Sequence, residues 1–277
     1  MADTAFSPAS HYDRMTAAWT LLLGEDLHYG VFQTGEEDLA SATSELTRLM
    51  IEHARLEPGL EVLDVGCGTG TPACWLAAEH GARVTGITTS AVGVALARER
   101  AKAAGVEALT AFEERDGTDN GLPDRSFDRV WVLESSHLMR RRDRLIAECA
   151  RVLRPGGRLV LCDIVLRRPM PFEEVRRLRG PLTLLREVWG DARMDPVSDY
   201  VERSTAEGLV VEDTLDLTAA TRPTFRHWRE NAHRHRSEVV AAVGEEDWQR
   251  FVDSCDVLDR FWDDGTLGYA LVAASKG

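Results

Sequence analysis

The sequence predicts an α/β protein with a doubly wound, mostly parallel seven-stranded sheet and a helical lid. Between residues 41 and 166, short apolar runs alternate with helical segments, which is typical of parallel strands covered by helices on both faces. Right-handed connections between such strands give the doubly wound arrangement. A glycine-rich loop directly follows the first apolar run, and ligands of these sheets bind beyond the carboxyl ends of the strands.

Seven segments have the character of strands. Most are short runs rich in branched apolar residues and bounded by glycine, proline or charged residues. The last two come after a long helical stretch, so we expect residues far along the chain to complete the sheet. The expected strands are Glu61–Val65, Ala82–Thr88, Ala108–Glu113, Arg129–Leu133, Arg158–Leu166, Leu209–Thr218 and Leu267–Lys276.

Helical segments separate these strands. In the helix expected before the first strand, Leu46, Met50 and His53 recur at helical spacing, and Pro58 and Gly59 follow its end. An aromatic segment within residues 1–35 is expected to form a short helix and a loop. The other expected helices are Ser41–Leu56, Pro72–His80, Ala91–Ala104, Asp143–Val152, Met170–Trp189, Pro196–Glu207, Thr224–Val243 and Asp247–Trp262.

The order of the expected strands and helices divides the chain into three parts. Residues 1–40 are expected to be an N-terminal lid segment, and residues 41–166 the cofactor-binding core. Residues 167–277 are expected to hold lid insertions together with the last two strands of the sheet. The helical material after Leu166 is the natural lid over the carboxyl-terminal edge of the sheet.

The composition of the chain argues against nucleic-acid-binding, membrane-spanning and secreted proteins. The 277 residues carry a formal net charge of −13, which argues against nucleic acid as a partner, because phosphates require a basic surface. No run of 18 apolar residues predicts a membrane span, and the N-terminus lacks a secretory signal. Five scattered cysteines are interpreted as reduced, mostly buried thiols of a cytoplasmic protein. The basic cluster Arg140–Arg144 is interpreted as the solvated start of a helix.

The glycine-rich loop is the strongest signal. Leu63–Gly70 reads LDVGCGTG, in which three alternate glycines let the backbone approach a ligand closely. A dinucleotide site would require glycine at position 71, which is Thr71, and an acidic residue about 20 residues further on. Neither is present, so the loop favours a different nucleoside cofactor.

Five stretches together resemble the class I S-adenosylmethionine (SAM)-dependent methyltransferase family, which has a Rossmann-like fold. The resemblance covers most of residues 40–166. It is carried by Glu61–Gly70, Val84–Ile87, Ser126–Asp128, Leu133–Ser135 and Arg151–Gly157.

Two further stretches, Leu27–Gly30 and Gly268–Val272, resemble a narrower group of natural-product enzymes. This group includes the rebeccamycin sugar O-methyltransferase and tocopherol C-methyltransferases. The resemblance implies that SAM is the cofactor, S-adenosylhomocysteine the product and a small molecule the substrate.

The resemblance also implies roles for single residues. Backbone groups of Gly66 and Gly68 would contact the methionine part of SAM, and Asp64 would fix the loop and favour its ammonium group. Asp116 would accept a hydrogen bond from the adenine amine, although an aspartate here is also typical of a turn. Most members of the family bind the ribose hydroxyls through an acidic residue. This chain has Thr88 and Thr89 in its place. The expected cofactor-binding residues are Asp64, Gly66, Cys67, Gly68, Gly70, Thr88, Thr89, Asp116, Gly117 and Glu134, with Ser135 beside the last.

Two residues at strand ends are candidates for catalysis. His137 follows the fourth strand and Asp163 lies in the fifth, so both face the same cleft. A histidine takes a hydroxyl proton near neutral pH, and a carboxylate orients it or holds the substrate. The sugar O-methyltransferase that the chain resembles has a second histidine where this chain has Leu138. His137 is therefore either a general base or a structural histidine, and Asp163 either orients it or caps a lid.

The lid contributes candidates of another kind. His28, Tyr29 and Trp189 are expected to close over the site, although such aromatic residues also serve as packing. The histidines of the segment 225–236 lack metal-ligand spacing, so no metal is expected and the segment is interpreted as a solvated helix. A homo-oligomer remains open, with no membrane partner expected.

Three functions therefore compete. The first is O-methylation of a hydroxyl with His137 as general base. The second is a C-methyltransferase, or a methyltransferase-like cyclase that retains the SAM pocket and rearranges a polyketide or terpenoid; Leu138 and the apolar lid favour it. The third is a non-catalytic module or a nucleic-acid methyltransferase, and the acidic charge opposes the latter.

Overall fold

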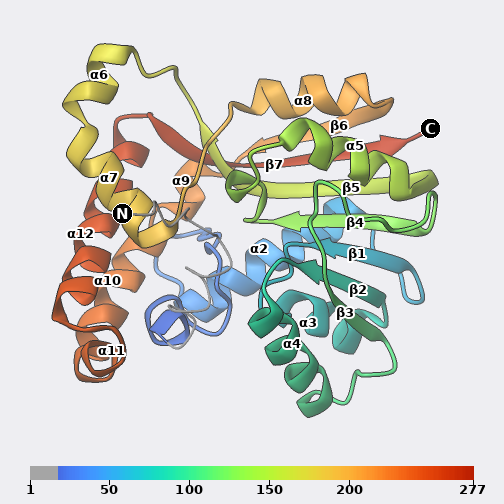
Figure 1. Cartoon of the computed structure of the whole chain (residues 1–277), viewed down its shortest axis with the longest axis horizontal. Helices are drawn as coiled ribbons and strands as arrows, with labels where there is room; N and C mark the ends of the chain where they lie inside the picture. Colours follow the sequence, from blue (N-terminus) through green and yellow to red (C-terminus); the bar gives the residue numbers. More distant parts are fainter. Residues whose placement is uncertain (1–17) are drawn as a thin grey trace, which may run out of the picture. The chain divides into compact units, whose positions relative to one another are not determined.

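The computed structural model describes residues 18–277, so the expectations for residues 1–17 lie outside the described residues. It contains a seven-stranded sheet in the order β3-β2-β1-β4-β5-β7-β6 (Figure 1). The strands are β1 (Glu61–Val65), β2 (Arg83–Thr88), β3 (Thr110–Glu114), β4 (Phe127–Leu133), β5 (Leu153–Leu166), β6 (Leu209–Asp216) and β7 (Leu267–Lys276).

The pairing of the strands confirms the predicted fold class. β1 pairs in parallel with β2 and β4, β2 with β3, and β4 with β5, whereas β6 and β7 are antiparallel. The order reverses between β1 and β4, which is the switch point where ligands of doubly wound sheets bind. The glycine loop that follows β1 therefore lies where the sequence predicts it.

Helices occupy the connections between the strands. The helices of the first part of the chain include α2 (Leu39–Ala54), α3 (Thr71–His80), α4 (Ala91–Ala103), the 3₁₀ turn η1 (Ser136–Leu138) and α5 (Arg142–Val152). Those of the later part are α6 (Phe172–Arg177), α7 (Arg179–Trp189), α8 (Val197–Ala206), α9 (Thr218–Thr221), α10 (Thr224–Arg234), α11 (Arg236–Val243) and α12 (Glu245–Asp263).

The chain divides into two compact units. One, here called the sheet unit, consists of Thr47–Val165, Asp195–Asp216 and Tyr269–Gly277. The other, here called the helical unit, consists, within the described residues, of residues 18–46, Leu166–Met194 and Leu217–Gly268.

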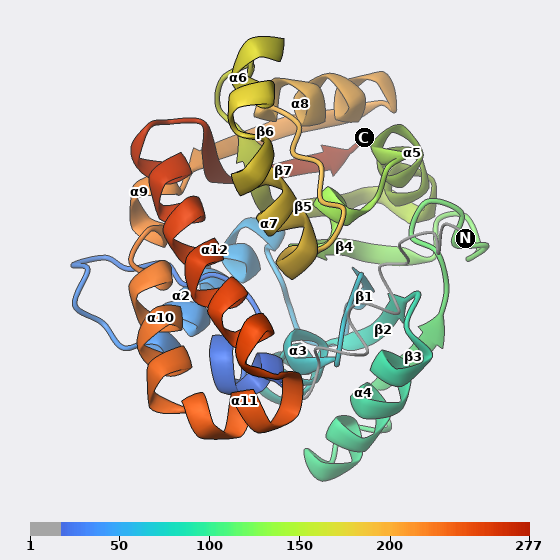
Figure 2. The same cartoon turned by 60° about the vertical axis from the view of Figure 1, so that its left-hand side comes forward.

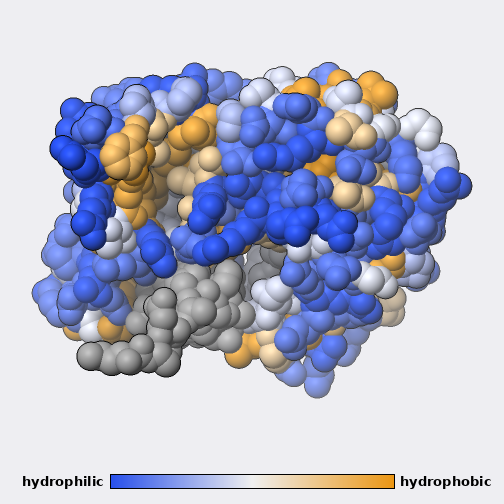
Figure 3. Space-filling model, turned by 45° about the horizontal axis from the view of Figure 1, so that its top comes forward, coloured by the Kyte–Doolittle hydropathy of each residue, from blue (hydrophilic) through white to orange (hydrophobic). Residues whose placement is uncertain are grey.

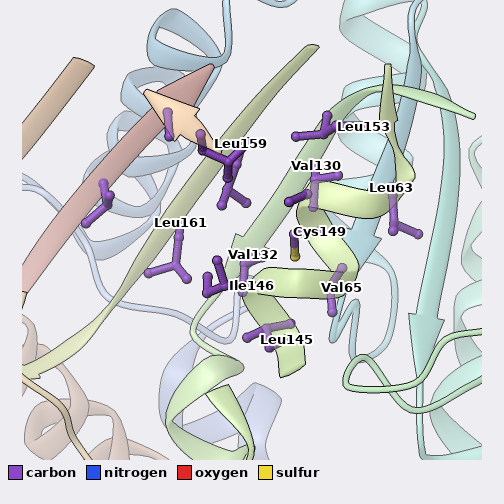
Figure 4. Close-up of a cluster of buried hydrophobic side chains, with 14 of the residues drawn as sticks. Leu63, Val65, Val130, Val132, Leu145, Ile146, Cys149, Leu153, Leu159 and Leu161 are labelled. Carbon is purple, nitrogen blue, oxygen red and sulfur yellow. The ribbon is translucent and has the colours of Figure 1, made fainter. Parts of the chain in front are cut away.

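The core of the sheet unit lies between the central strands and α5 (Figure 4). α5 is amphipathic: its apolar residues recur at positions i, i+1, i+4 and i+7, so they share one face. Alternate residues of each strand point to the same side of the sheet and meet this face. The buried side chains in this contact include Leu145, Ile146, Cys149 and Val152 from α5, and Leu63, Val65, Val130, Val132, Leu159 and Leu161 from the strands.

The helical unit is built around α12, which packs against α7, α10 and α11 (Figure 2). Its buried face carries large aromatic residues at helical spacing, among them Trp248, Phe251 and Trp262. Trp189 of α7 and Trp228 of α10 lie side by side, with ring centroids 5.3 Å apart. Aromatic packing therefore supplies much of the core of this unit.

Three predicted elements differ from the structure by more than two residues at an end or by an interruption. β5 begins at Leu153 rather than Arg158, and the register shifts between Phe127 and Arg129 of its partner β4; such an irregularity accommodates proline and glycine within the strand. The expected helix over residues 170–189 is two helices, α6 and α7, because Pro181 lacks the N–H that would continue the first into the second. The expected helix over residues 224–243 is likewise interrupted, at His235.

The surface drawn in Figure 3 is mainly hydrophilic, with apolar residues in smaller patches. Exposed large hydrophobic side chains include Phe172, Val175 and Val210. No helix within residues 18–277 is long and apolar enough to span a bilayer. The five cysteines are free and buried.

Candidate functional site

The glycine loop adopts a conformation that requires glycine. Gly66, Gly68 and Gly70 have φ angles of 81°, 54° and 78°, in the left-handed region that side chains rarely adopt. A Cβ added to Gly66 would lie 2.2 Å from the Cβ of Ser135. The amides of Gly66 and Cys67 both donate to the carbonyl of Ile87, at 2.8 and 3.0 Å. The loop is thus held against the ends of β2 and β4, and there is no room for a side chain at Gly66.

Asp64, the fourth residue of β1, has a buried carboxylate with an unsatisfied oxygen. The residue is 2% exposed, and its Oδ2 has no hydrogen-bond partner among residues 18–277. Burial raises the pKa of Asp64 to about 7. A buried acceptor without a donor is costly, and such groups in native proteins mark places where a ligand supplies the donor. Asp64 is therefore a candidate partner for a cationic or hydrogen-bond-donating group beside the glycine loop.

The end of β4 forms a second backbone corner. Ser135 donates from Oγ to the carbonyl of Val65 at 2.7 Å, which ties this corner to the glycine loop. Glu134 has φ 47°, an unusual value for a residue with a side chain. Its carboxylate accepts a hydrogen bond from the Tyr269 hydroxyl of β7 at 2.5 Å. Tyr269 is completely buried, so it fixes Glu134 from inside the sheet unit.

The other expected cofactor residues lie along the same strand ends. Asp116 is exposed after β3, and its Oδ1 accepts from the amide and the hydroxyl of Thr118, both at 2.8 Å, as in an Asx turn. Gly117 is buried, and a Cβ there would lie 2.6 Å from Val65. Thr88 ends β2 and Thr89 is exposed beside it. Cys67 is buried, and burial raises the pKa of its thiol well above the usual value, as suits a loop filler.

His137 and Asp163 are in direct contact. His137 lies in η1 after β4, and its Nδ1 is 2.5 Å from Oδ1 of Asp163, which is completely buried in β5. Burial alone would lower the pKa of His137, but the charge and hydrogen bond of Asp163 raise it above 6.5. Burial would also raise the pKa of Asp163, but the charge and hydrogen bonds of His137, with one from Ser136, hold it below 3.8. The geometry is that of a histidine oriented by a carboxylate, which leaves Nε2 as the nitrogen able to accept a proton.

Three residues around this pair were not predicted from the sequence. Ser136 donates to Asp163, Tyr200 of α8 lies 2.8 Å from the Ser136 hydroxyl, and Arg142 of α5 donates to the Ser136 carbonyl. Arg142 is buried, so the interpretation of its basic cluster as solvated is wrong at this one position. No spacing in the sequence connects Tyr200 with Ser136, since 64 residues separate them.

The expected lid residues belong to the helical unit. His28 is buried, burial lowers its pKa, and its Nδ1 is 2.8 Å from the carbonyl of Tyr29. Tyr29 stacks on Trp262 at 5.5 Å. Trp189 stacks on Trp19 at 5.2 Å and donates from Nε1 to a serine of α12. These contacts are those of packed residues within that unit.

The histidine-rich helix α10 is half buried rather than solvated. His227 stacks on Phe32 at 5.2 Å, and burial lowers its pKa. Trp228 of the same helix is 1% exposed. Across the described residues, 18–277, no three histidine, cysteine or acidic side chains converge as metal ligands.

Comparisons with known proteins agree with this fold. The 27-O-demethylrifamycin SV methyltransferase of Amycolatopsis mediterranei (strain S699) is 35% identical over 266 residues, 96% of this chain and 95% of that protein. The crystal structure of the [4+2]-cyclase SpnF superposes with a TM-score of 0.82 at 29% identity, covering 97% of this chain and 95% of that one. The mycolic acid cyclopropane synthase CmaA1, complexed with SAH and CTAB, gives a TM-score of 0.86 at 17% identity, covering 97% and 96%.

A doubly wound sheet with a glycine loop at its switch point, together with these similarities, defines a SAM-dependent methyltransferase. The resemblance noted from the sequence motifs is thereby confirmed. The chain belongs to the family described as mycolic acid cyclopropane synthetase, which matches residues 3–262.

Proposed function

We propose that this enzyme transfers the methyl group of SAM to a hydroxyl of a small-molecule natural product, with His137 as the general base. The observation that carries the proposal is the contact of 2.5 Å between His137 Nδ1 and Asp163 Oδ1 at the ends of β4 and β5. The relative from A. mediterranei, whose name gives a rifamycin as the acceptor, supports the substrate class.

The residues of the sheet unit fit SAM. The unsatisfied oxygen of Asp64 suits the ammonium group of its methionine part, and Gly66 and Gly68, which have no side chain, let the backbone come close to a ligand. We assign Glu134 to the same end of the cofactor and Asp116, with Gly117, to the adenine end. Thr88 and Thr89 stand where the ribose hydroxyls would be held. When bound, SAM supplies an activated methyl group on a positively charged sulfur.

The protein then has two tasks: to align the acceptor hydroxyl and to take its proton. Asp163 holds the proton of His137 on Nδ1, so Nε2 is the base. Because Asp163 raises the pKa of His137, the neutral form that acts as the base is fully available only at a higher pH than for a free imidazole. The acid limb of the profile of kcat/KM against pH is therefore expected at a higher pH than a free imidazole would give.

The test is His137→Gln, which keeps a polar side chain of similar size and removes the base. We expect kcat to fall by roughly 10²-fold to 10⁴-fold, with the affinity for SAM unchanged. His80→Gln, at the end of α3, is the matched control. Methyl transfer at the wild-type rate by His137→Gln contradicts the assignment of the base.

A second candidate function is supported by one feature of the chain and one comparison. Leu138 stands where the similar sugar enzyme has a second histidine, and SpnF, a [4+2]-cyclase, is 29% identical. Mass spectrometry separates the two, because methyl transfer adds one methyl group to the acceptor whereas cyclisation leaves the mass unchanged.

We also propose that the enzyme acts in the cytoplasm. The five free, buried cysteines support this compartment, in which thiols stay reduced. Fractionation of producing cells, with detection of the intact chain, tests it.

A further inference from the structure

The carboxylate of Asp163 is held by donors on both oxygens. Oδ1 is 2.5 Å from His137 Nδ1 and accepts from the amide of Ile164 at 2.8 Å. Oδ2 accepts from the Ser136 hydroxyl at 2.5 Å and from the amide of His137 at 3.1 Å. The carboxylate is completely buried, so these donors, and not water, set its rotation and its charge distribution.

The hydroxyl of Ser136 determines the direction of the next hydrogen bond. It has one proton, which goes to Asp163 because an ionised carboxylate only accepts. The Tyr200 hydroxyl, 2.8 Å from Ser136 Oγ, must therefore be the donor of that contact. The result is a directed chain from Tyr200 through Ser136 and Asp163 to His137.

A packing role alone does not require the hydroxyl of Tyr200. The residue is 1% exposed and belongs to the apolar core between α5 and the sheet. Phenylalanine would fill this position without a polar group to satisfy, and a buried hydroxyl is tolerated only with a partner. Ser136, beside the candidate base, is that partner.

Arg142 connects the turn that carries His137 with the segment just before α8. Its Nε and Nη2 each contact a different oxygen of Asp195 at 2.7 Å, just before α8. Its Nη1 donates to the carbonyls of Ser136 at 3.3 Å and Met139 at 3.1 Å, which flank His137. Arg203 of α8 contacts Asp195 at 2.7 Å from the other side. The turn that carries His137 is thus anchored to α8 at a second point.

We propose that Tyr200 is a positioning residue for methyl transfer: through Ser136 it orients the Asp163 carboxylate, and through Asp163 the imidazole of His137. This inference rests on the proposed role of His137. Besides Asp163, the charged or titratable groups that act on His137 are Glu134 at the end of β4 and Arg142 of α5.

Tyr200→Phe tests the chain with the ring retained. Without the tyrosine proton, Ser136 donates more weakly, so more of the Asp163 charge acts on His137. The pKa of His137 should rise by about half a unit, and kcat should fall about threefold to tenfold, the effect of one net hydrogen bond. Ser136→Ala removes the donor itself and should shift this pKa further in the same direction. The KM for SAM should stay within about twofold, because the cofactor does not contact Tyr200 in this assignment.

The readout is the titration of His137 in the full chain, followed by ¹⁵N NMR and assigned by the signal lost in His137→Gln. The matched control is Ser204→Ala, one turn further along α8, which removes a buried hydroxyl that has no partner within residues 18–277. An upward shift in Tyr200→Phe and Ser136→Ala, but not in Ser204→Ala, supports the proposal. No shift, a downward shift, or an equal shift in all three variants overturns it.

The outcome is separable from that of the proposed function. If His137→Gln retains full methyl transfer while Tyr200→Phe shifts the His137 titration, the base is wrong, and Tyr200 orients His137 without a role in methyl transfer. If His137→Gln abolishes transfer while the titration does not move, the base stands and the positioning is wrong.

Discussion

Asp64→Asn is expected to stabilise the cofactor-free protein and to weaken its binding of SAM. Asp64 is buried with an unsatisfied oxygen, and burial raises its pKa from 3.8 to about 7. At about 1.4 kcal/mol per pH unit, this shift corresponds to roughly 4 kcal/mol. Because the folded protein binds the proton more tightly than the unfolded chain does, stability falls as the pH rises from 3.8 to about 7. Asparagine cannot ionise, so it avoids this loss.

The expected gain therefore depends on pH. Above pH 7 the free energy of unfolding of cofactor-free Asp64→Asn should exceed that of the wild type by up to about 4 kcal/mol, and near pH 4 the two should agree. The loss in binding comes from the missing charge opposite the ammonium group. A charge-assisted hydrogen bond contributes about 1.5–3 kcal/mol, so the Kd for SAM should rise roughly 10-fold to 100-fold.

Urea unfolding between pH 4 and 8.5 measures the first effect, and titration calorimetry with SAM measures the second. Asp119→Asn is the control, since Asp119 is exposed. A variant that is no more stable than the wild type at pH 8, with the same Kd for SAM, refutes the reasoning about a buried charge reserved for the cofactor.

Three further predictions concern the same strand ends. Gly66→Ala places a Cβ 2.2 Å from that of Ser135 at a φ of 81°, so it should lose well over the ~1–2 kcal/mol of backbone strain alone, measured as a lower Tm, and lose SAM binding in calorimetry. Asp163→Asn removes the charge that raises the pKa of His137, so the acid limb of kcat/KM should move to lower pH while kcat falls roughly 10²-fold; an unmoved limb contradicts the pairing. Tyr269→Phe removes a hydrogen bond to a carboxylate at the end of β4 and should reduce the free energy of unfolding by about 1.5–3 kcal/mol in urea; no change indicates that the corner is held by other contacts.

Local patterns predicted the sheet well because its strands are short, apolar and sharply bounded. β1 and β7 have the predicted boundaries, since charged or turn residues stand at their ends. The start of β5 was missed because Pro155 and two glycines suggest a loop, whereas pairing with β4 places them within an irregular strand. Such pairing depends on residues distant in sequence, which no local pattern contains.

The functional site likewise contains residues that local sequence patterns predict and residues that they do not. The glycine loop, His137 and Asp163 could be predicted, because the carboxyl ends of parallel strands lie at one edge of the sheet. Tyr200 and Arg142 could not, since their contacts follow from the packing of α8 against α5. The charged run that contains Arg142 resembles a solvated helix start, and only tertiary structure shows which arginine turns inward.

The destination of the methyl group tests the central claim most directly. The enzyme is incubated with SAM carrying a ¹³C-labelled methyl group and with hydroxylated natural products, and the position of the label in the product is read by NMR. We expect a labelled methyl on oxygen with the wild type, and its loss with His137→Gln. A label on carbon, or a rearranged product that carries none, contradicts it.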